Sequence, residues 1–153
     1  MRLNNLILMA FFLIGSTPSK ELPVKGLGIG AQGILAFFPA LSIRGWIGNA
    51  GIETSFMGIV IGGEGNMYGD AKILLRTSPT SWGSFYGGPA AGIFKNIGKD
   101  GLSTTMGIGM VFGTEILAFS SFTFFIDAGF GYLNFPTTYY FGPIGSIGVY
   151  WYP

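Results

Sequence analysis

The sequence contains no histidine and no cysteine, and these two absences exclude several classes of function. Mechanisms that need a histidine as general base or as a member of a catalytic triad cannot operate in this chain. A zinc site would lack both of its preferred ligand types. Without cysteine there is neither a disulfide framework nor a lipid-modified cysteine. We therefore predict a non-enzymatic protein with no catalytic residues, no metal site and no cofactor.

Charged residues are also scarce. They make up 10% of the 153 residues, whereas soluble domains contain about 25%. A surface that faces water is hard to build from so few charges when 49% of the residues are hydrophobic. The net charge of +1 and the absence of a basic cluster argue against nucleic acid as a partner.

A membrane-spanning helix is not indicated either, because no segment after residue 14 offers the roughly 20 uninterrupted apolar residues that such a helix needs. The most apolar later stretch, "TTMGIGMVFGTEIL" at Thr104–Leu117, alternates between two faces. One face carries Met106, Ile108, Met110, Phe112 and Ile116, and the other carries Gly107, Gly109, Val111, Gly113 and Glu115. A period of two is the pattern of a β-strand with one apolar face. Glycine also disfavours a helix by about 1 kcal/mol relative to alanine.

Eight segments follow one another in the chain, most with this alternation, separated by turns rich in glycine, proline or asparagine. They span Val24–Phe37, Ala40–Gly48, Ile52–Ile61, Met67–Arg76, Trp82–Phe94, Thr104–Leu117, Ser121–Leu133 and Tyr139–Tyr152. Pro39 is expected to end the first segment, and Pro89 and Pro143 to disturb the fifth and the last. Lys95–Gly101 is expected to form the longest connection. An even number of such strands predicts an all-β fold, an antiparallel up-and-down transmembrane β-barrel of eight strands.

The first residues form a separate unit. Arg2 precedes a short apolar run from Leu6 to Ile14, and small residues follow. This arrangement is typical of a secretory signal peptide. We predict that residues 1–19 are this peptide, with cleavage near residues 16–19, and that residues 20–153 form a single barrel domain.

Aromatic residues gather near the two expected rims of the barrel, as the girdles of transmembrane barrels do. The outer rim would carry Phe37, Phe38, Tyr132, Phe135, Tyr139 and Tyr140, and the inner rim Trp82, Phe119, Trp151 and Tyr152. With the leader, the alternating strands and the aromatic last strand "GSIGVYWYP", the chain resembles the small, eight-stranded outer-membrane β-barrel proteins of bacteria over Val24–Tyr152. The resemblance implies a bacterial outer-membrane location, contact with membrane lipid and insertion by the barrel-assembly machinery. The chain departs from the family's usual aromatic end, because Pro153 follows Tyr152.

Seven ionisable residues fall on the predicted inner face. They are Arg44, Glu53, Asp70, Lys72, Arg76, Glu115 and Asp127. Three are basic and four acidic, so we predict a near-balanced charge network that fills the lumen and has a structural role. A turn at Asn49–Ala50 would set Trp46 opposite Glu53, with Arg44 diagonal to it.

Two features of the sequence resemble catalytic or ligand-binding motifs, and we interpret both as structural. Glu115 and Asp127 lie on the inner faces of adjacent predicted strands, but charged residues in barrel interiors are mostly paired for stability. The dinucleotide-like spacing "GIGAQG" at Gly28–Gly33 lacks the helix that such a loop requires. We interpret its inward glycines as packing positions.

Several hypotheses about function remain open at this point. The favoured one is an outer-membrane barrel with a structural or passive role. A second is a barrel that binds or transports a small apolar ligand, because many inward positions are glycine. A third is a helical inner-membrane protein with a span or hairpin over Thr104–Leu133, which would place Glu115 and Asp127 in lipid. A fourth is an exported soluble barrel of lipocalin type, which would need a more polar exterior.

Overall fold

The computed structural model of the chain describes residues 25–34, 38–98, 101–119, 121–134 and 138–153, and it contains eight β-strands in this part. The strands are β1 (Lys25–Ile34), β2 (Phe38–Ile47), β3 (Ala50–Ile61), β4 (Glu64–Arg76), β5 (Gly83–Gly98), β6 (Gly101–Phe119), β7 (Phe122–Asn134) and β8 (Tyr139–Trp151). The predicted signal peptide lies outside the described residues.

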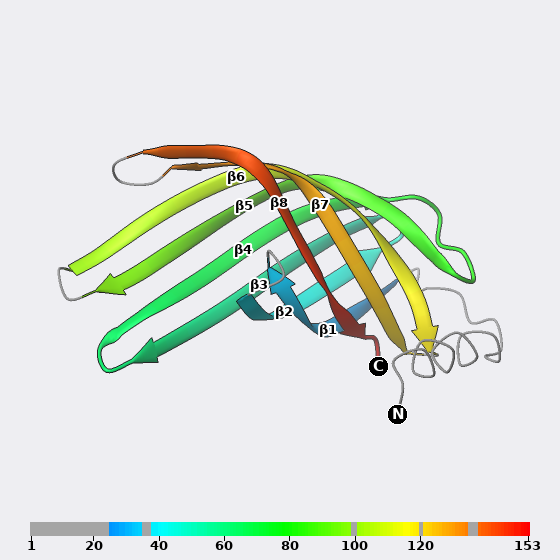
Figure 1. Cartoon of the computed structure of the whole chain (residues 1–153). Helices are drawn as coiled ribbons and strands as arrows, with labels where there is room; N and C mark the ends of the chain where they lie inside the picture. Colours follow the sequence, from blue (N-terminus) through cyan, green and yellow to red (C-terminus); the bar gives the residue numbers. More distant parts are fainter. Residues whose placement is uncertain (1–24, 35–37, 99–100, 120, 135–137) are drawn as a thin grey trace, which may run out of the picture.

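Each strand pairs with the next one along the chain, and β8 closes the sheet onto β1 (Figure 1). All pairings are antiparallel, and the closing ladder joins Ile29–Ile34 to Ser146–Trp151. The predicted all-β, eight-stranded, antiparallel closed barrel is therefore confirmed. The helical alternative over Thr104–Leu133 is disfavoured, because β6 and β7 occupy this region.

No helix in the described part of the chain is both long and apolar enough to span a lipid bilayer.

The barrel has two ends of different character. At the proximal end lie the end of β8 and the two-residue turn Gly48–Asn49, and at the distal end lies the turn Gly62–Gly63 between β3 and β4. Figure 1 shows the hairpins β3–β4 and β5–β6 reaching farther to the left, toward the distal end, than β1 and β2. Gly62 and Gly63 both have positive φ, 61° and 85°, which tight hairpin turns between twisted strands require and which glycine adopts without strain.

The turn at Gly48–Asn49 corrects the predicted register between β2 and β3. It lies one residue earlier than the expected turn at Asn49–Ala50, and this difference moves every pair by two positions. Arg44 therefore stands directly opposite Glu53, and Trp46 stands opposite Gly51.

The prolines disturb the sheet less than expected. Pro39 does not separate the first two strands but lies inside β2, opposite Gly33. Pro89 and Pro143 lie within continuous strands, opposite Met110 and Phe130. The expected long connection Lys95–Gly101 is also corrected, because β5 continues to Gly98 and β6 begins at Gly101.

The side chains alternate across the wall of the barrel as the sequence predicts. Leu41, Ile52 and Phe112 point outward and are 71%, 63% and 62% exposed. Between such residues, the inward side chains are buried, and on β3 the burial pattern alternates strictly from Ala50 to Gly58. The predicted faces of β6 and β7 are confirmed.

Tyr152 is an exception to the predicted aromatic rims. Trp82, Phe119 and Trp151 are exposed, as expected, but Tyr152 is buried inside the barrel. Its backbone N–H donates to the carbonyl of Ser121 at 2.7 Å. This bond continues the strand alternation one residue past β8, and Tyr152 therefore faces the interior, as Tyr150 does.

Candidate functional site

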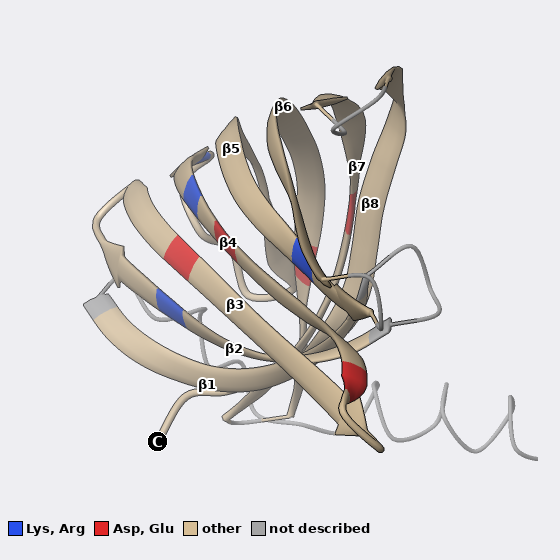
Figure 2. Ribbon diagram, turned by 90° about the vertical axis from the view of Figure 1, so that its left-hand side faces the viewer, with Lys and Arg blue, Asp and Glu red and all other residues tan. Residues whose placement is uncertain are grey.

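The seven predicted inward charges all occur on the inner side of the barrel wall, but they do not form one uniform cluster. In Figure 2, charged positions on β2, β3 and β4 lie on neighbouring strands, and the acidic position on β7 lies elsewhere around the barrel. Six of the seven side chains are buried, and Asp70 is partly buried.

Glu53 on β3 is the centre of the ion-pair network. Its carboxylate accepts a hydrogen bond from Arg44 Nε at 2.7 Å and a second one from Arg44 Nη2. Its other oxygen lies 2.7 Å from Lys72 Nζ on β4. Arg44 and Glu53 are both fully buried, and a buried carboxylate is stable in its charged form only when it is paired in this way.

The network extends from Glu53 in both directions. Lys72 Nζ also donates to Asp127 Oδ2 on β7 at 3.1 Å, and Arg44 Nη1 lies 3.8 Å from Glu115 Oε1 on β6. The charges therefore alternate along a chain that runs Glu115–Arg44–Glu53–Lys72–Asp127. These five residues come from five strands, so the chain of charges ties separate parts of the wall together.

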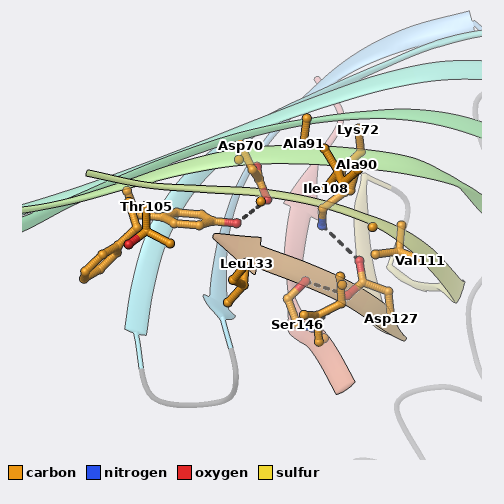
Figure 3. A pocket seen from close by; sticks show the side chains of 18 of the residues that line it. Asp70, Lys72, Ala90, Ala91, Thr105, Ile108, Val111, Asp127, Leu133 and Ser146 are labelled. Carbon is orange, nitrogen blue, oxygen red and sulfur yellow. Dashed lines mark hydrogen bonds and ion pairs between the residues drawn. The ribbon is translucent and has the colours of Figure 1, made fainter. Parts of the chain in front are cut away.

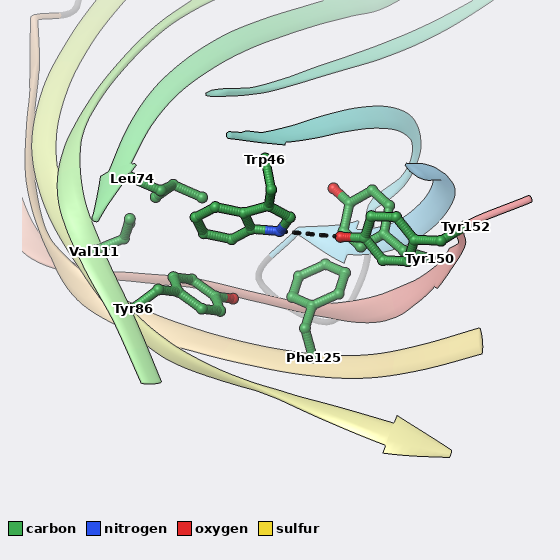
Figure 4. Packing of buried hydrophobic residues seen from close by; sticks show 7 residues of the cluster. All are labelled: Trp46, Leu74, Tyr86, Val111, Phe125, Tyr150 and Tyr152. Carbon is green, nitrogen blue, oxygen red and sulfur yellow. Dashed lines mark hydrogen bonds between the residues drawn. The ribbon is translucent and has the colours of Figure 1, made fainter. Parts of the chain in front are cut away.

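Aromatic rings surround the guanidinium group of Arg44. Its Cζ atom lies 4.4 Å from the ring centroid of Tyr150, 4.6 Å from that of Phe125 and 4.7 Å from that of Tyr86. Cations are attracted to aromatic faces within about 6 Å, most strongly where water is excluded. Figure 4 shows these rings with Trp46 in one buried group.

Hydrogen bonds fix the proximal end of this group. Trp46 Nε1 donates to the hydroxyl of Tyr152 at 3.2 Å, as Figure 4 shows. The Tyr152 hydroxyl donates to Glu115 Oε1 at 2.7 Å, and Thr123 Oγ1 donates to the same oxygen at 2.9 Å. We call the ion-pair network, these aromatic side chains and Thr123 the plug, defined by Arg44, Trp46, Glu53, Lys72, Tyr86, Glu115, Thr123, Phe125, Asp127, Tyr150 and Tyr152.

Arg76 lies on the proximal side of Lys72 on β4, and Asp70 lies on its distal side. Arg76 donates to the carbonyl of Gly48 at 3.1 Å from Nη2, and its Cζ lies 4.1 Å from the ring centroid of Trp46. Asp70 accepts hydrogen bonds from Ser55 at 2.5 Å and from the hydroxyl of Tyr68 at 2.7 Å.

The two carboxylates considered as a catalytic pair are not opposite each other. Glu115 stands opposite Phe125, and Asp127 stands opposite Gly113. Each carboxylate is bonded to its own partners, Glu115 to Thr123 and Tyr152, and Asp127 to Lys72 and Ser146. The structure therefore brings them into one network without making them a pair.

Uncharged polar residues that the sequence analysis did not single out complete the network. The hydroxyl of Ser146 on β8 lies 2.7 Å from Asp127 Oδ1 and 3.1 Å from Gln32 Oε1 on β1. Gln32 in turn donates to Ser55 on β3. With the bond from Arg44 Nη2 to the Tyr86 hydroxyl on β5, at 3.3 Å, the bonded groups come from all eight strands. The sequence signal that could have identified these polar residues is their position on the inward face of the alternating strands.

A cavity of about 280 Å³ lies on the distal side of the plug (Figure 3). On each of the strands β3 to β8 its lining residues are farther toward the distal end than the plug residues of that strand, as Val111 and Thr105 are relative to Glu115 on β6. Lys72 and Asp127, which belong to both, form its floor, and Figure 3 shows the ion pair between them. Most of the remaining lining is apolar.

Glycines explain why space remains in so narrow a barrel. Gly107, Gly109 and Gly131 line the cavity. A Cβ atom on Gly107 would overlap the side chain of Leu133, and a Cβ on Gly109 would come within 3.0 Å of Ile144. Leu133 and Ile144 therefore lie against a bare glycine wall, which leaves the centre open. An eight-stranded barrel with ordinary side chains would be filled.

The first two glycines of "GIGAQG" also lie close against large side chains. A Cβ atom on Gly28 would come within 2.7 Å of the ring of Tyr152, and one on Gly30 would come within 2.6 Å of the ring of Tyr150. This geometry agrees with the packing interpretation. Among the described residues, no group of three or more potential metal ligands comes together.

No protein-family model and no curated protein sequence matches the chain.

Proposed function

We propose that the protein is a bacterial outer-membrane β-barrel with a structural or passive role, and that its plug keeps it from conducting ions. The observation that carries this proposal is the inversion of polarity across the wall: large apolar side chains face outward, and the charges face inward. Soluble barrels require the opposite arrangement on their exterior.

The apolar exterior supports a membrane location. Exposed large hydrophobic side chains occur on every strand, from Ile29 on β1 to Ile147 on β8. Monomeric soluble proteins rarely expose connected apolar patches of more than a few hundred Å². Among the charged residues whose side chains the structure describes, the exposed ones are Glu64 and Lys95, and both lie near distal hairpin ends. A charge in the middle of the lipid face would cost about 2–4 kcal/mol.

The plug supports a closed lumen. Its charges are cross-linked and nearly balanced, whereas a channel that selects ions of one sign typically carries an excess of the opposite charge. The bonded groups join all eight strands, so their main effect is to fix the register of the barrel. We also propose a non-enzymatic role, which the absence of histidine and cysteine and the hydrogen-bonded interior carboxylates support.

The proposed partners are the membrane lipids and the barrel-assembly machinery. Residues 1–19 would direct export, and the aromatic strand β8 would serve as the assembly signal. Fractionation of cells that express the full chain should recover it in the outer membrane. Recovery in the inner membrane or the soluble fraction would contradict this location.

Planar-bilayer recordings test the closed lumen. We expect the purified wild-type protein to give no steady current above that of a protein-free bilayer. A Trp46→Ala/Tyr150→Ala variant, which removes two large plug side chains, should conduct if its sheet content by circular dichroism is unchanged. Large, steady, ion-selective currents from the wild-type protein would refute the proposal in favour of a channel.

A further inference from the structure

The cavity distal to the plug has the properties of a ligand site. Its walls come from β3 to β8 and are mostly apolar, with glycine and alanine at Ala90, Gly92, Gly107, Gly109 and Gly131. Apolar concave sites with a few polar groups at one place are the usual form of small-molecule sites in proteins. The structural role of the plug does not require this space.

The charged groups that line the cavity already have bonding partners. Lys72 is paired with Glu53 and Asp127, and Asp70 accepts from Ser55 and Tyr68. None of the cavity-lining side chains is among the buried polar groups without a hydrogen-bond partner in the described part of the chain. A ligand would therefore be held by shape and apolar contact, because few free donors or acceptors face it.

The charge of the cavity lining limits the ligand further. The lining contains one ammonium group, Lys72, and two carboxylates, Asp70 and Asp127. This excess of negative charge repels an anion, and a largely apolar site strengthens the repulsion. Fatty acids in their ionised form are therefore poor candidates.

The size of the cavity sets the size of the ligand. An engineered apolar cavity of about 150 Å³ accommodates benzene, and a water-sized group occupies about 30 Å³. A cavity of about 280 Å³ therefore accommodates roughly nine or ten heavy atoms at that volume per group. We propose that the distal cavity binds an uncharged, hydrocarbon-like molecule of this size.

The proposal concerns the interior of the barrel and is independent of where the barrel resides. It goes beyond the proposed structural role. A negative result for ligand binding would not contradict that role, and a negative result for that role would not contradict ligand binding.

Equilibrium dialysis with two matched ligands tests the site. We would measure radiolabelled 1-octanol and octanoate against the full chain in lipid nanodiscs, with empty nanodiscs to subtract partition into lipid. The expected result is saturable binding of one octanol per barrel and at least tenfold weaker binding of octanoate at neutral pH. Equal binding of the two ligands would overturn the charge argument, and no saturable octanol binding would overturn the site.

Two variants of the same chemistry separate the cavity from the rest of the surface. Ala90 lines the cavity, so Ala90→Phe should fill it and abolish saturable binding. Ala128 lies on the exposed outer face of β7, and Ala128→Phe should leave binding unchanged. Because Ala90→Phe could also disturb packing, Thr105→Phe near the distal mouth serves as a second blocking variant, with sheet content measured for each. Unchanged octanol binding in both folded blocking variants would contradict the assignment of the site.

Discussion

The interaction between Arg44 and Glu53 should dominate the stability of the barrel interior, and alanine substitutions measure it. Arg44→Ala removes two hydrogen bonds to Glu53, the ion pair with Glu115 and the contacts with three aromatic rings. Because both partners are fully buried, we expect a loss of about 3–5 kcal/mol in the free energy of unfolding.

Glu53→Ala should cost somewhat less, near the lower end of the same range of about 3–5 kcal/mol. Arg44 would keep Glu115 at 3.8 Å, and Lys72 would keep Asp127 at 3.1 Å. In the double variant neither charge of the pair is left behind. The double change should therefore cost less than the sum of the single changes, with a coupling energy of about 2 kcal/mol, within the range measured for neighbouring residues.

Equilibrium unfolding in urea, with the chain folded into lipid vesicles and followed by circular dichroism, gives the four free energies of the cycle. Lys95→Ala is the matched control, because Lys95 is exposed near the distal end of β5. Combined with Glu53→Ala, it should be additive to within about 0.5 kcal/mol. A strictly additive Arg44/Glu53 cycle, or single changes of less than about 1 kcal/mol, would refute the view that buried pairing stabilises this interior.

Two further predictions concern packing and export. Gly51→Ala should destabilise the barrel by about 1–3 kcal/mol through overpacking, because a Cβ there would overlap the indole of Trp46. In the same unfolding assay Gly69→Ala should have little effect, since a Cβ at that position comes no closer than 3.8 Å to its nearest neighbour, and equal losses would contradict the packing argument. N-terminal sequencing of membrane-extracted protein should find a chain that begins after the region of residues 16–19, and a chain that still begins at Met1 would contradict the predicted signal peptide.

The faces of the strands could be predicted from sequence because alternation carries that information directly. On β6 and β7 most inward positions between the outward Ile and Phe residues are glycine or polar, and a one-residue slip would exchange the two faces. The number of strands followed from the turns between them. These features are local, so a single sequence is sufficient to find them.

The register between strands could not be predicted with the same certainty. The turn sequence "GNAG" allows a two-residue turn at Gly48–Asn49 or at Asn49–Ala50, and the choice decides whether Arg44 faces Glu53 directly. In the structure Gly48 has a φ of 60°, as a turn at Gly48–Asn49 requires. The sequence alone does not give this backbone angle. For Tyr152 two signals conflict: its aromatic ring at the chain end predicts the inner girdle, whereas its place in the alternation predicts the interior, where the structure has it.

Contacts across the lumen could not be predicted from the sequence. Lys72 and Asp127 are 55 residues apart, and their ion pair depends on how the sheet closes between β8 and β1. The cavity likewise results from Leu133 and Ile144 lying against glycines of neighbouring strands. The inward glycines predict an open space inside the barrel. Its position and volume depend on how these two side chains pack, which the sequence does not give.

Labelling of single cysteines tests most directly whether the apolar exterior lies in lipid and the plug does not. Because the chain has no cysteine of its own, Phe124→Cys and Thr123→Cys can be compared in native membranes, where neither variant carries a second labelling site. Phe124 is 55% exposed and Thr123, a plug residue outside the cavity lining, is 0% exposed, and the two are neighbours on β7. A lipid-soluble maleimide should label Phe124→Cys and spare Thr123→Cys, while a water-soluble reagent should label neither. Equal labelling of both positions by the lipid-soluble reagent, or labelling of Phe124→Cys by the water-soluble one, would contradict a membrane-spanning barrel.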